Sequence, residues 1–156
     1  MKRSKTTIEV DQSIKIGDLS GATALAFSDH DCGAILIPAE VKRTLIMQLR
    51  ARGKSKIRAT VQIFAAAAFL LLEKATPKIS SVIIDTEYTG YEADIEGMLL
   101  NLLRGVEPGF SKERLAILQV GKSSPAHKLA IAVVRGQVKP DRVLTTEDFA
   151  TALGWK

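Results

Sequence analysis

The first part of the chain has the alternation of apolar and polar residues that is typical of short strands. Residues 7–11 alternate as in a half-buried strand that ends at or near Asp11, and residues 12–21 carry the Gly, Asp and Ser of a turn region. Two apolar runs follow at 22–28 and 32–37, and the polar segment between them predicts an antiparallel pair joined by a tight turn. Three consecutive strands are therefore expected.

After the third strand the pattern changes to a helical period, and helices then alternate with strands. Val41, Leu45 and Leu49 recur at helical spacing between Pro38, suited to a first turn, and Gly53, suited to a C-terminal stop. A second helix is expected from Ser55 and ends before Pro77, and a buried strand follows at 79–84. The next helix has capping-box spacing from Thr89 to Glu92 and ends at Gly105. The remaining elements are a strand at 115–120, a helix from Ser124 to Gly136 and an acidic helix from near Glu147.

This order of elements predicts an α/β fold. Three antiparallel strands followed by right-handed crossovers give a mixed five-stranded sheet with helices on both faces. The chain has 156 residues, of which 46% are hydrophobic, and no shift in composition divides it. We therefore expect a single domain over 1–156, with its core at 6–136 and a C-terminal extension at 137–156.

Charge and cysteine content narrow the class of protein. The formal net charge is +5, from 22 basic and 17 acidic residues, which is compatible with a polyanionic partner. Cys32 is the single cysteine, so no intramolecular disulfide can form, and a reducing compartment is expected. The basic start of the chain has no apolar segment of a signal peptide, and the run 64–72 is about half the roughly 20 residues that cross a bilayer. The expected location is the cytoplasm, with no membrane partner.

Four polar residues are candidates for a shared site. Asp11 closes the first strand, Asp85 and Glu87 follow the fourth, and His127 lies in the first turn of the helix after the fifth. If the first and fourth strands are parallel neighbours, Asp11 and Asp85 lie side by side, where two carboxylates stay ionised cheaply only with a cation. Oxygen ligands of this kind select Mg²⁺ or Mn²⁺, and a helix N-terminus favours the neutral ring of His127 that a metal requires.

Each of these residues also has a plain structural interpretation. Asp85 and Glu87 could solubilise a strand end or cap the next helix, and aspartate is common in turns such as the one expected after Asp11. His127 could satisfy the exposed amides of its own helix. The joint placement of the four residues on one side of a sheet is what favours a shared site.

Three segments resemble the ribonuclease H-like superfamily. The first is Asp11-Gln12-Ser13 at the end of the first strand, and the second is the acid-bearing strand at 78–88. The third, PAHKLAIA at 125–132, is similar to the last motif of RuvC-type resolvases, in which an acid or histidine precedes small and aliphatic residues on the final helix. The resemblance covers residues 6–136.

The resemblance implies a nuclease that uses two divalent ions, Mg²⁺ or Mn²⁺. Asp11, Asp85 or Glu87, and His127 would be the ligands and catalytic residues. The family usually has a fourth acid on the first long helix or near the last motif, and in this chain Glu40 or Glu87 would take that place. If neither does, the metal site is incomplete.

Basic residues cluster where the first two long helices meet. Charge runs of this kind usually form a solvated surface, yet this one has no acidic neighbours in sequence and could contact phosphates. Lys122, just before a helix N-terminus, adds a candidate anion contact. The predicted nucleic-acid-binding residues are Arg50, Arg52, Lys54, Lys56, Arg58 and Lys122.

Three functions remain open at this point. The first is a metal-dependent nuclease that hydrolyses phosphodiester bonds in structured DNA or RNA. The second is a non-catalytic protein of the same fold that binds nucleic acid or takes part in assembly. The third is an α/β protein that binds a small anionic ligand at 122–126. A homodimer is among the partners considered, because an enzyme that cuts junctions requires two copies.

Overall fold

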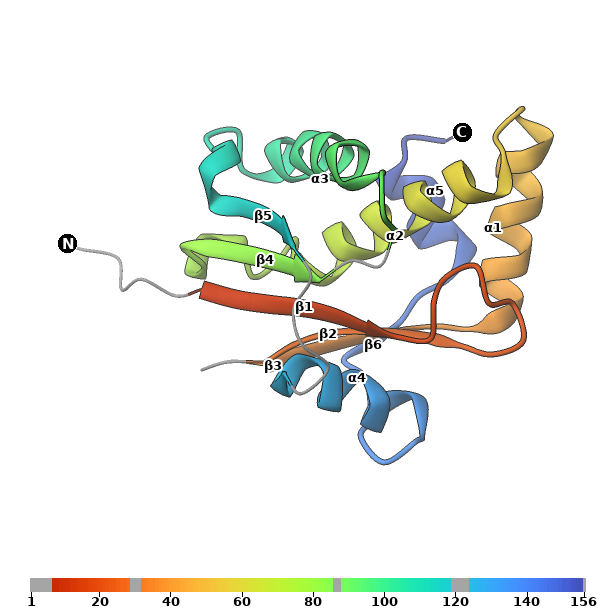
Figure 1. Ribbon diagram of the computed structural model, residues 1–156, viewed down its shortest axis with the longest axis horizontal. Coiled ribbons are helices and arrows are strands. Elements are labelled where there is room, and N and C mark those ends of the chain that lie inside the picture. Colours follow the sequence, from red (N-terminus) through yellow and green to blue (C-terminus); the bar gives the residue numbers. More distant parts are fainter. Residues whose placement is uncertain (1–6, 29–31, 86–87, 119–123, 156) are drawn as a thin grey trace.

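A computed structural model describes residues 7–28, 32–85, 88–118 and 124–155 (Figure 1). Over these ranges the protein is an α/β structure with a mixed six-stranded sheet and five α-helices. The strands are β1 (Thr7–Ser13), β2 (Thr23–Ser28), β3 (Cys32–Ile37), β4 (Ser81–Asp85), β5 (Leu115–Leu118) and β6 (Arg142–Val143). The helices are α1 (Ala39–Ala51), α2 (Lys56–Leu72), α3 (Glu92–Val106), α4 (Pro125–Val134) and α5 (Thr146–Ala152), with short 3₁₀ turns η1 (Thr76–Lys78) and η2 (Lys112–Arg114).

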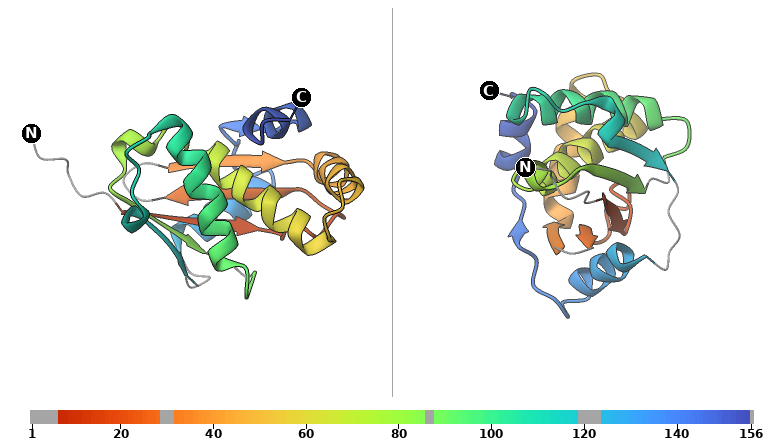
Figure 2. Two further views of the ribbon diagram at one scale, coloured as in Figure 1. Left: turned by 90° about the horizontal axis from the view of Figure 1, so that it is seen from above. Right: turned by 90° about the vertical axis from the view of Figure 1, so that its left-hand side faces the viewer.

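The strands follow the order β5-β4-β1-β2-β3-β6. β1, β2 and β3 are antiparallel neighbours, β4 runs parallel to β1, and β5 runs parallel to β4. Helices cover both faces: α2 and α3 lie on one side of the sheet and α4 lies alone on the other (Figures 1 and 2). The predicted mixed sheet with helices on both faces is confirmed as an α/β arrangement, and β6 adds a sixth strand to the five expected.

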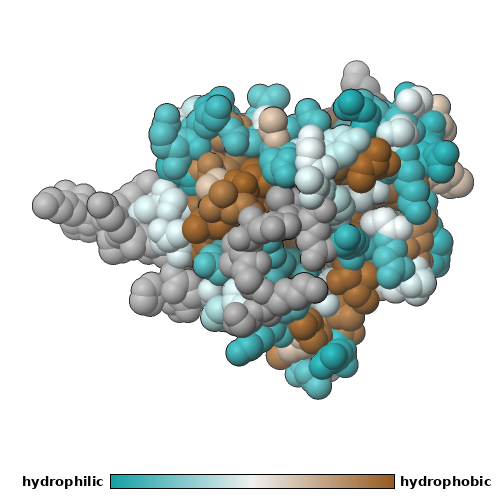
Figure 3. Space-filling view, in the orientation of Figure 1, coloured by the Kyte–Doolittle hydropathy of each residue, from teal (hydrophilic) through white to brown (hydrophobic). Residues whose placement is uncertain are grey.

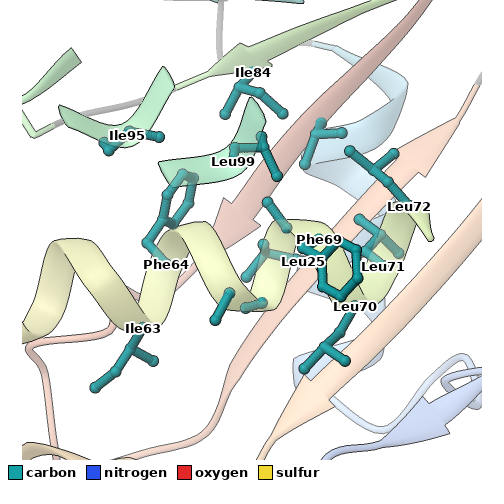
Figure 4. Close-up of a cluster of buried hydrophobic side chains, with 14 of the residues drawn as sticks. Leu25, Ile63, Phe64, Phe69, Leu70, Leu71, Leu72, Ile84, Ile95 and Leu99 are labelled. Carbon is teal, nitrogen blue, oxygen red and sulfur yellow. The ribbon is translucent and has the colours of Figure 1, made fainter. Parts of the chain in front are cut away.

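The main core lies between the sheet and the long helix α2. Thirteen of the residues of α2 are buried, because the helix packs against the sheet on one side and against α3 on the other. Figure 4 shows Phe64 of α2 near Leu99 of α3, and Leu72 of α2 and Ile84 of β4 belong to the same cluster. Burying side chains of this size stabilises the fold by about 1.5–3 kcal/mol each, so α2 is the central element of the core.

The opposite face has a smaller core made from small side chains. Ala24, Ala26 and Ala34 of β2 and β3 pack against Ala130 and Val133 of α4. Alanine on the sheet lets the helix approach closely, and this packing fixes α4 over β1 and β2. The position of α4 therefore determines which residues of the sheet lie beneath the N-terminus of this helix.

The first strand extends beyond its predicted end. Gln12 and Ser13 pair with Leu25 and Ala24 of β2, so β1 continues through residues that were predicted to form a turn. Asp11 therefore lies inside the strand instead of at its tip. Polar residues can belong to a strand when the partner strand supplies the backbone hydrogen bonds. The residue types at positions 12 and 13 do not reveal that such a partner is present.

The predicted capping box at the start of α3 is wrong. Tyr91 is the N-cap residue and its side chain makes no capping bond, while the Glu92 carboxylate accepts a hydrogen bond from the amide of Gly90 at 2.9 Å. Gly90 has a φ of 90°, so the chain turns in a left-handed conformation that glycine permits, and Thr89 stays outside the helix. The caps predicted at Ser55 and Ser124 are confirmed, because these side chains accept from the amides of Arg58 and His127.

The face of the molecule in Figure 3 carries several separate apolar areas. On the face shown in Figure 3, the brown hydrophobic areas are separated by teal hydrophilic residues. Within the described ranges, no helix has the length and apolar character that crossing a membrane requires.

Candidate metal-binding carboxylate site

The parallel pairing of β1 and β4 brings two aspartates together. Val10 is in register with Ile84, so the next residues along the two strands, Asp11 and Asp85, lie side by side. Val10 and Ile84 belong to the main core, and side chains alternate along a strand, so the two carboxyl groups project toward the opposite face of the sheet. This is the face that carries α4. The predicted adjacency of Asp11 and Asp85 is therefore found in the structure.

The N-terminus of α4 delivers His127 to the same place. Ser124 caps the helix by accepting a hydrogen bond from the amide of His127 at 3.1 Å, and Pro125 occupies the first helical position. The imidazole Nδ1 of His127 then lies 2.9 Å from Oδ2 of Asp11. Three residues from β1, β4 and α4 thus form one cluster, which we call the carboxylate site: Asp11, Asp85 and His127.

Burial makes the charge on Asp11 costly. Only 7% of its side chain is exposed, and desolvation is the main reason why its pKa is raised to about 6. A hydrogen bond with the Asp85 carboxyl group and the negative charge of Asp85 raise the pKa of Asp11 further. The backbone amide of Gln12, which donates to Oδ1 of Asp11 at 2.7 Å, and the nearby His127 act in the opposite direction. Two carboxyl groups in this position compete for a single proton or share a cation.

Two atoms of the site have unused bonding capacity. Oδ2 of Asp11 and Nδ1 of His127 are buried and face each other, but they are not aligned as a hydrogen bond, and neither has another hydrogen-bond partner within the described residues. Buried polar atoms are normally hydrogen-bonded, so an exception of this kind needs an explanation. An additional cation or proton at this point would give Oδ2 of Asp11 a partner and would offset the negative charge of the carboxylates.

The raised pKa of Asp11 has a consequence for stability. The folded carboxyl group has a pKa of about 6 against an ordinary 3.8, so between these values the folded state binds more protons than the unfolded state. The contribution of Asp11 to stability therefore falls as pH rises through this window, by about 3 kcal/mol in total. Denaturant unfolding in EDTA should show the stability of Asp11→Asn relative to the wild type increasing as pH rises from about 4 to about 6, and levelling off above that. A difference that is independent of pH would contradict this assignment.

The layer beneath the site links it to the other face of the sheet. Gln12, next to Asp11, is 7% exposed, and its Oε1 accepts a hydrogen bond from the hydroxyl of Tyr88 at 3.4 Å. The same hydroxyl accepts from the amide of Ile16 at 3.3 Å, and the Tyr88 ring meets Phe64 edge to face with centroids 5.3 Å apart. Nε2 of Gln12 has no hydrogen-bond partner among the described residues. Tyr88 and Gln12 therefore connect the end of β1 to the start of α3.

A buried lysine holds the loop that follows β1. Lys42 of α1 is fully buried, and its ammonium group donates to the carbonyl of Asp18 and, at 3.0 Å, to Oγ1 of Thr23. Burial lowers the pKa of Lys42 to about 8. Thr23 in turn donates to the carbonyl of Ile14, which has a φ of 66° and is strained in this left-handed conformation because it is β-branched. The lysine thus keeps a strained loop closed beside the site.

Some predicted residues lie elsewhere. Glu40 is exposed in the first turn of α1 and is not among the groups that act on the pKa of Asp11. Glu87 and Lys122 lie outside the described residues, so their predicted roles stay predictions. The other five predicted nucleic-acid contacts are exposed, and none of them forms an ion pair with a described residue: Arg50, Arg52, Lys54, Lys56 and Arg58.

The sequence interpretation missed Gln12, Tyr88 and Lys42. A signal existed for Lys42, because it falls on the apolar stripe of its helix between Val41 and Leu45 and is therefore placed in the core. Gln12 gave no signal, since a polar residue after an aspartate reads equally well as part of a turn.

The donor set fits a divalent ion held by two carboxylates. In the described part of the chain, no three His, Cys, Asp or Glu side chains are grouped so that they could hold a metal. Mg²⁺, however, is commonly bound by one or two carboxylates, with waters and substrate phosphates completing its coordination. Asp11 and Asp85 meet that requirement, and in this arrangement His127 contacts Asp11 instead of completing a three-ligand cluster.

Comparisons with protein-family models, with curated proteins and with solved structures found no match to this chain. The functional argument therefore depends on the carboxylate site and its surroundings.

Proposed function

We propose that this protein is a metal-dependent nuclease with a ribonuclease H-like fold. The observation that carries the proposal is the pairing of Asp11 and Asp85 across parallel strands β1 and β4, both buried and both on the face to which α4 brings His127. Three antiparallel strands followed by two strands parallel to β1 agree with the fold that the sequence resemblance implies. Mg²⁺ or Mn²⁺ would be the cofactor.

Each residue of the site has a distinct task in this proposal. Asp11 and Asp85 would hold the divalent ion, and the chemistry it would supply is an activated water and neutralisation of charge on a phosphodiester. Asp11 is kept in position by the amide of Gln12 on one oxygen, and its other oxygen faces His127. His127 can take or return a proton beside Asp11, because its Nδ1 is within hydrogen-bonding distance and has no other partner among the described residues. The sequence predicts Glu40 or Glu87 as a further ligand, and Glu87 comes two residues after Asp85 in the chain.

The exposed basic segment supports a nucleic-acid substrate. Arg50, Arg52, Lys54, Lys56 and Arg58 run from the last turn of α1 to the first turn of α2 and are all exposed. Arg52 also lies over the ring of Trp155, with its guanidinium carbon 4.3 Å from the ring centroid. Five exposed cations that form no ion pair with a described residue attract phosphates, and their contribution to binding weakens as salt is raised.

A cleavage assay tests the proposal. The purified protein is incubated with single-stranded, duplex, hybrid and branched nucleic acids in Mg²⁺, in Mn²⁺ and in EDTA. We expect cleavage of at least one substrate with either metal and none in EDTA, since the buried carboxylates need the cation to act on a phosphate. A complete lack of cleavage with both metals, from a protein that binds the same substrates, would overturn the proposal.

One observation favours a second candidate, a non-catalytic nucleic-acid-binding protein. In the described part of the chain the carboxylates are not joined by a third metal ligand, and His127 can offset the charge of Asp11 without any metal. This candidate predicts salt-sensitive binding of nucleic acid with no cleavage in either ion. It also predicts that Mn²⁺ leaves the thermal stability of the protein unchanged.

A further inference from the structure

A groove lies on the α2 side of the sheet, just past the end of β1. It has a volume of about 720 Å³ and is walled by the loop after β1, the first turn of α2 and the turn that leads into α3. This volume is within the range of small-molecule sites, about 300–1,000 Å³. Its lining residues are Lys15, Gly17, Asp18, Lys56, Ile57, Thr60, Tyr88, Thr89 and Tyr91.

The chain has two tyrosines, and both line this groove. Tyr88 is buried and forms the inner wall, with its hydroxyl in contact with Gln12 beside the carboxylate site. Tyr91 is half-buried at the start of α3 and lies at the outer side of the main core. Aromatic residues make up only 5% of the chain, a composition that by itself argues against a stacking surface. The fold concentrates the tyrosines in one place, which composition cannot show.

A second, smaller groove shares Tyr91 with the first. It has a volume of about 120 Å³, and Tyr91 forms part of the lining of both grooves. Lys54 and Arg58 line the smaller groove, as Lys15 and Lys56 line the larger. The two grooves together form a track in which basic side chains lie on either side of an aromatic ring.

The charge of the track favours an anionic chain. Lys15, Lys54, Lys56 and Arg58 face two carboxylates, Asp18 and Asp94. Asp18 is turned toward its own loop, because it accepts hydrogen bonds from the amide and hydroxyl of Ser20, and these bonds lower its pKa. Among the described residues that line the two grooves, cations therefore outnumber acids, which favours a polyanionic chain.

We propose that this track, which we call the tyrosine track, binds an unpaired strand of nucleic acid and leads it to the carboxylate site. A base stacks on Tyr91, and phosphates on either side contact the lysines and the arginine. A duplex would bury its bases within the helix and could not offer a base face to the ring, whereas base stacking on an aromatic side chain works for any unpaired sequence. This inference rests on the proposed function, because it names the class of substrate on which the carboxylate site would act.

The link between track and site is direct. Tyr88 lines the larger groove and donates a hydrogen bond to Gln12, whose backbone amide holds Asp11. Gln12 is buried, and it joins the inner wall of the larger groove to Asp11. The strand would thus pass from the α2 side around the end of β1 toward Asp11 and Asp85.

The test is a binding measurement in EDTA, where cleavage cannot interfere. A short fluorescein-labelled oligothymidine is titrated with protein and followed by fluorescence anisotropy. Tyr91→Ala should raise Kd about tenfold, because one stacked base is lost. Tyr91→Phe keeps the ring and should bind as the wild type does. The double substitution Lys15→Gln with Lys56→Gln should reduce the salt dependence of log K by about 1.4, the value for two phosphate contacts on a single strand.

Lys74→Gln is the matched control, since Lys74 is exposed just beyond the opposite end of α2 and should leave both quantities unchanged. Thermal unfolding of each variant reports whether it is folded, and the lysine variants test the track if Tyr91→Ala does not fold. Unchanged oligothymidine binding in folded Tyr91→Ala or in the lysine variants would overturn the inference. A matched duplex that binds more tightly than the single strand and depends on the same residues would also overturn it.

These outcomes are independent of the nuclease proposal. Track-dependent binding without cleavage in Mg²⁺ or Mn²⁺ would support the tyrosine track and refute the nuclease. Metal-dependent cleavage that is unaffected by the track variants would support the nuclease and refute the tyrosine track.

Discussion

Asp11→Asn and Asp85→Asn should each reduce Mg²⁺-dependent cleavage by on the order of a thousandfold or more. An amide binds a divalent cation far more weakly than a carboxylate, and the pair offers only one ligand from each strand. The measurement is the initial cleavage rate on the best substrate of the wild type. Glu9→Gln is the matched control, because Glu9 lies on the same strand and the same face two residues before Asp11.

Loss of activity in these variants should not reflect unfolding. Asp11→Asn removes a buried carboxyl group whose pKa is raised to about 6. In EDTA at pH values above 6, the free energy of unfolding of this variant is therefore expected to exceed that of the wild type. A variant that is inactive and more stable than the wild type points to a lost metal ligand. Wild-type rates in both aspartate variants would remove Asp11 and Asp85 from the mechanism.

Lys42→Met should be the most destabilising single substitution near the site, costing about 3 kcal/mol. Methionine keeps the length of the side chain but leaves the part-buried Asp18 carbonyl and the buried Thr23 hydroxyl without the donor that Lys42 supplies. The loop after β1 would then lose the contact that closes it. Denaturant unfolding followed by the fluorescence of Trp155 measures the loss.

The neighbouring Arg43 provides the control for Lys42. Arg43 is exposed and donates to the carbonyl of Leu19 at 2.9 Å, so Arg43→Met should cost well under half as much. If Lys42→Met and Arg43→Met were equally mild, the buried lysine would not be holding the loop.

The sequence predicted the elements wherever a periodic pattern or a cap was long enough to read. The alternation at 7–11 and the apolar runs at 22–28 and 32–37 located β1 to β3, and Ser124 with Pro125 located α4 and hence His127. The adjacency of Asp11 and Asp85 followed from one assumption, that the first and fourth strands are parallel neighbours, and this pairing is present.

Other features could not be predicted because they depend on partners distant in sequence. β6 has two residues, too few for any periodicity, and forms because Arg142 and Val143 pair with Ile35 and Leu36 of β3. The orientation of His127 toward Asp11 depends on how closely α4 packs on the alanines of β2 and β3. The tyrosine track is likewise assembled from three segments that meet only in the folded protein.

The carboxylate site explains three separate observations with one hypothesis. The raised pKa of Asp11, the lack of a hydrogen-bond partner for its Oδ2 among the described residues and the facing Nδ1 of His127 all indicate a buried position that would accept a positive charge. A divalent ion between Asp11 and Asp85 would supply it, at the end of β1 where the tyrosine track also ends.

Crystals of the wild-type protein soaked in Mn²⁺ test this account most directly, because manganese is located by its anomalous scattering. The account predicts a peak between Asp11 and Asp85, bound to one carboxylate oxygen from each, and no peak there in crystals of Asp11→Asn. Full soaking with no manganese between the two aspartates, or manganese bound only at other acidic residues, would contradict it.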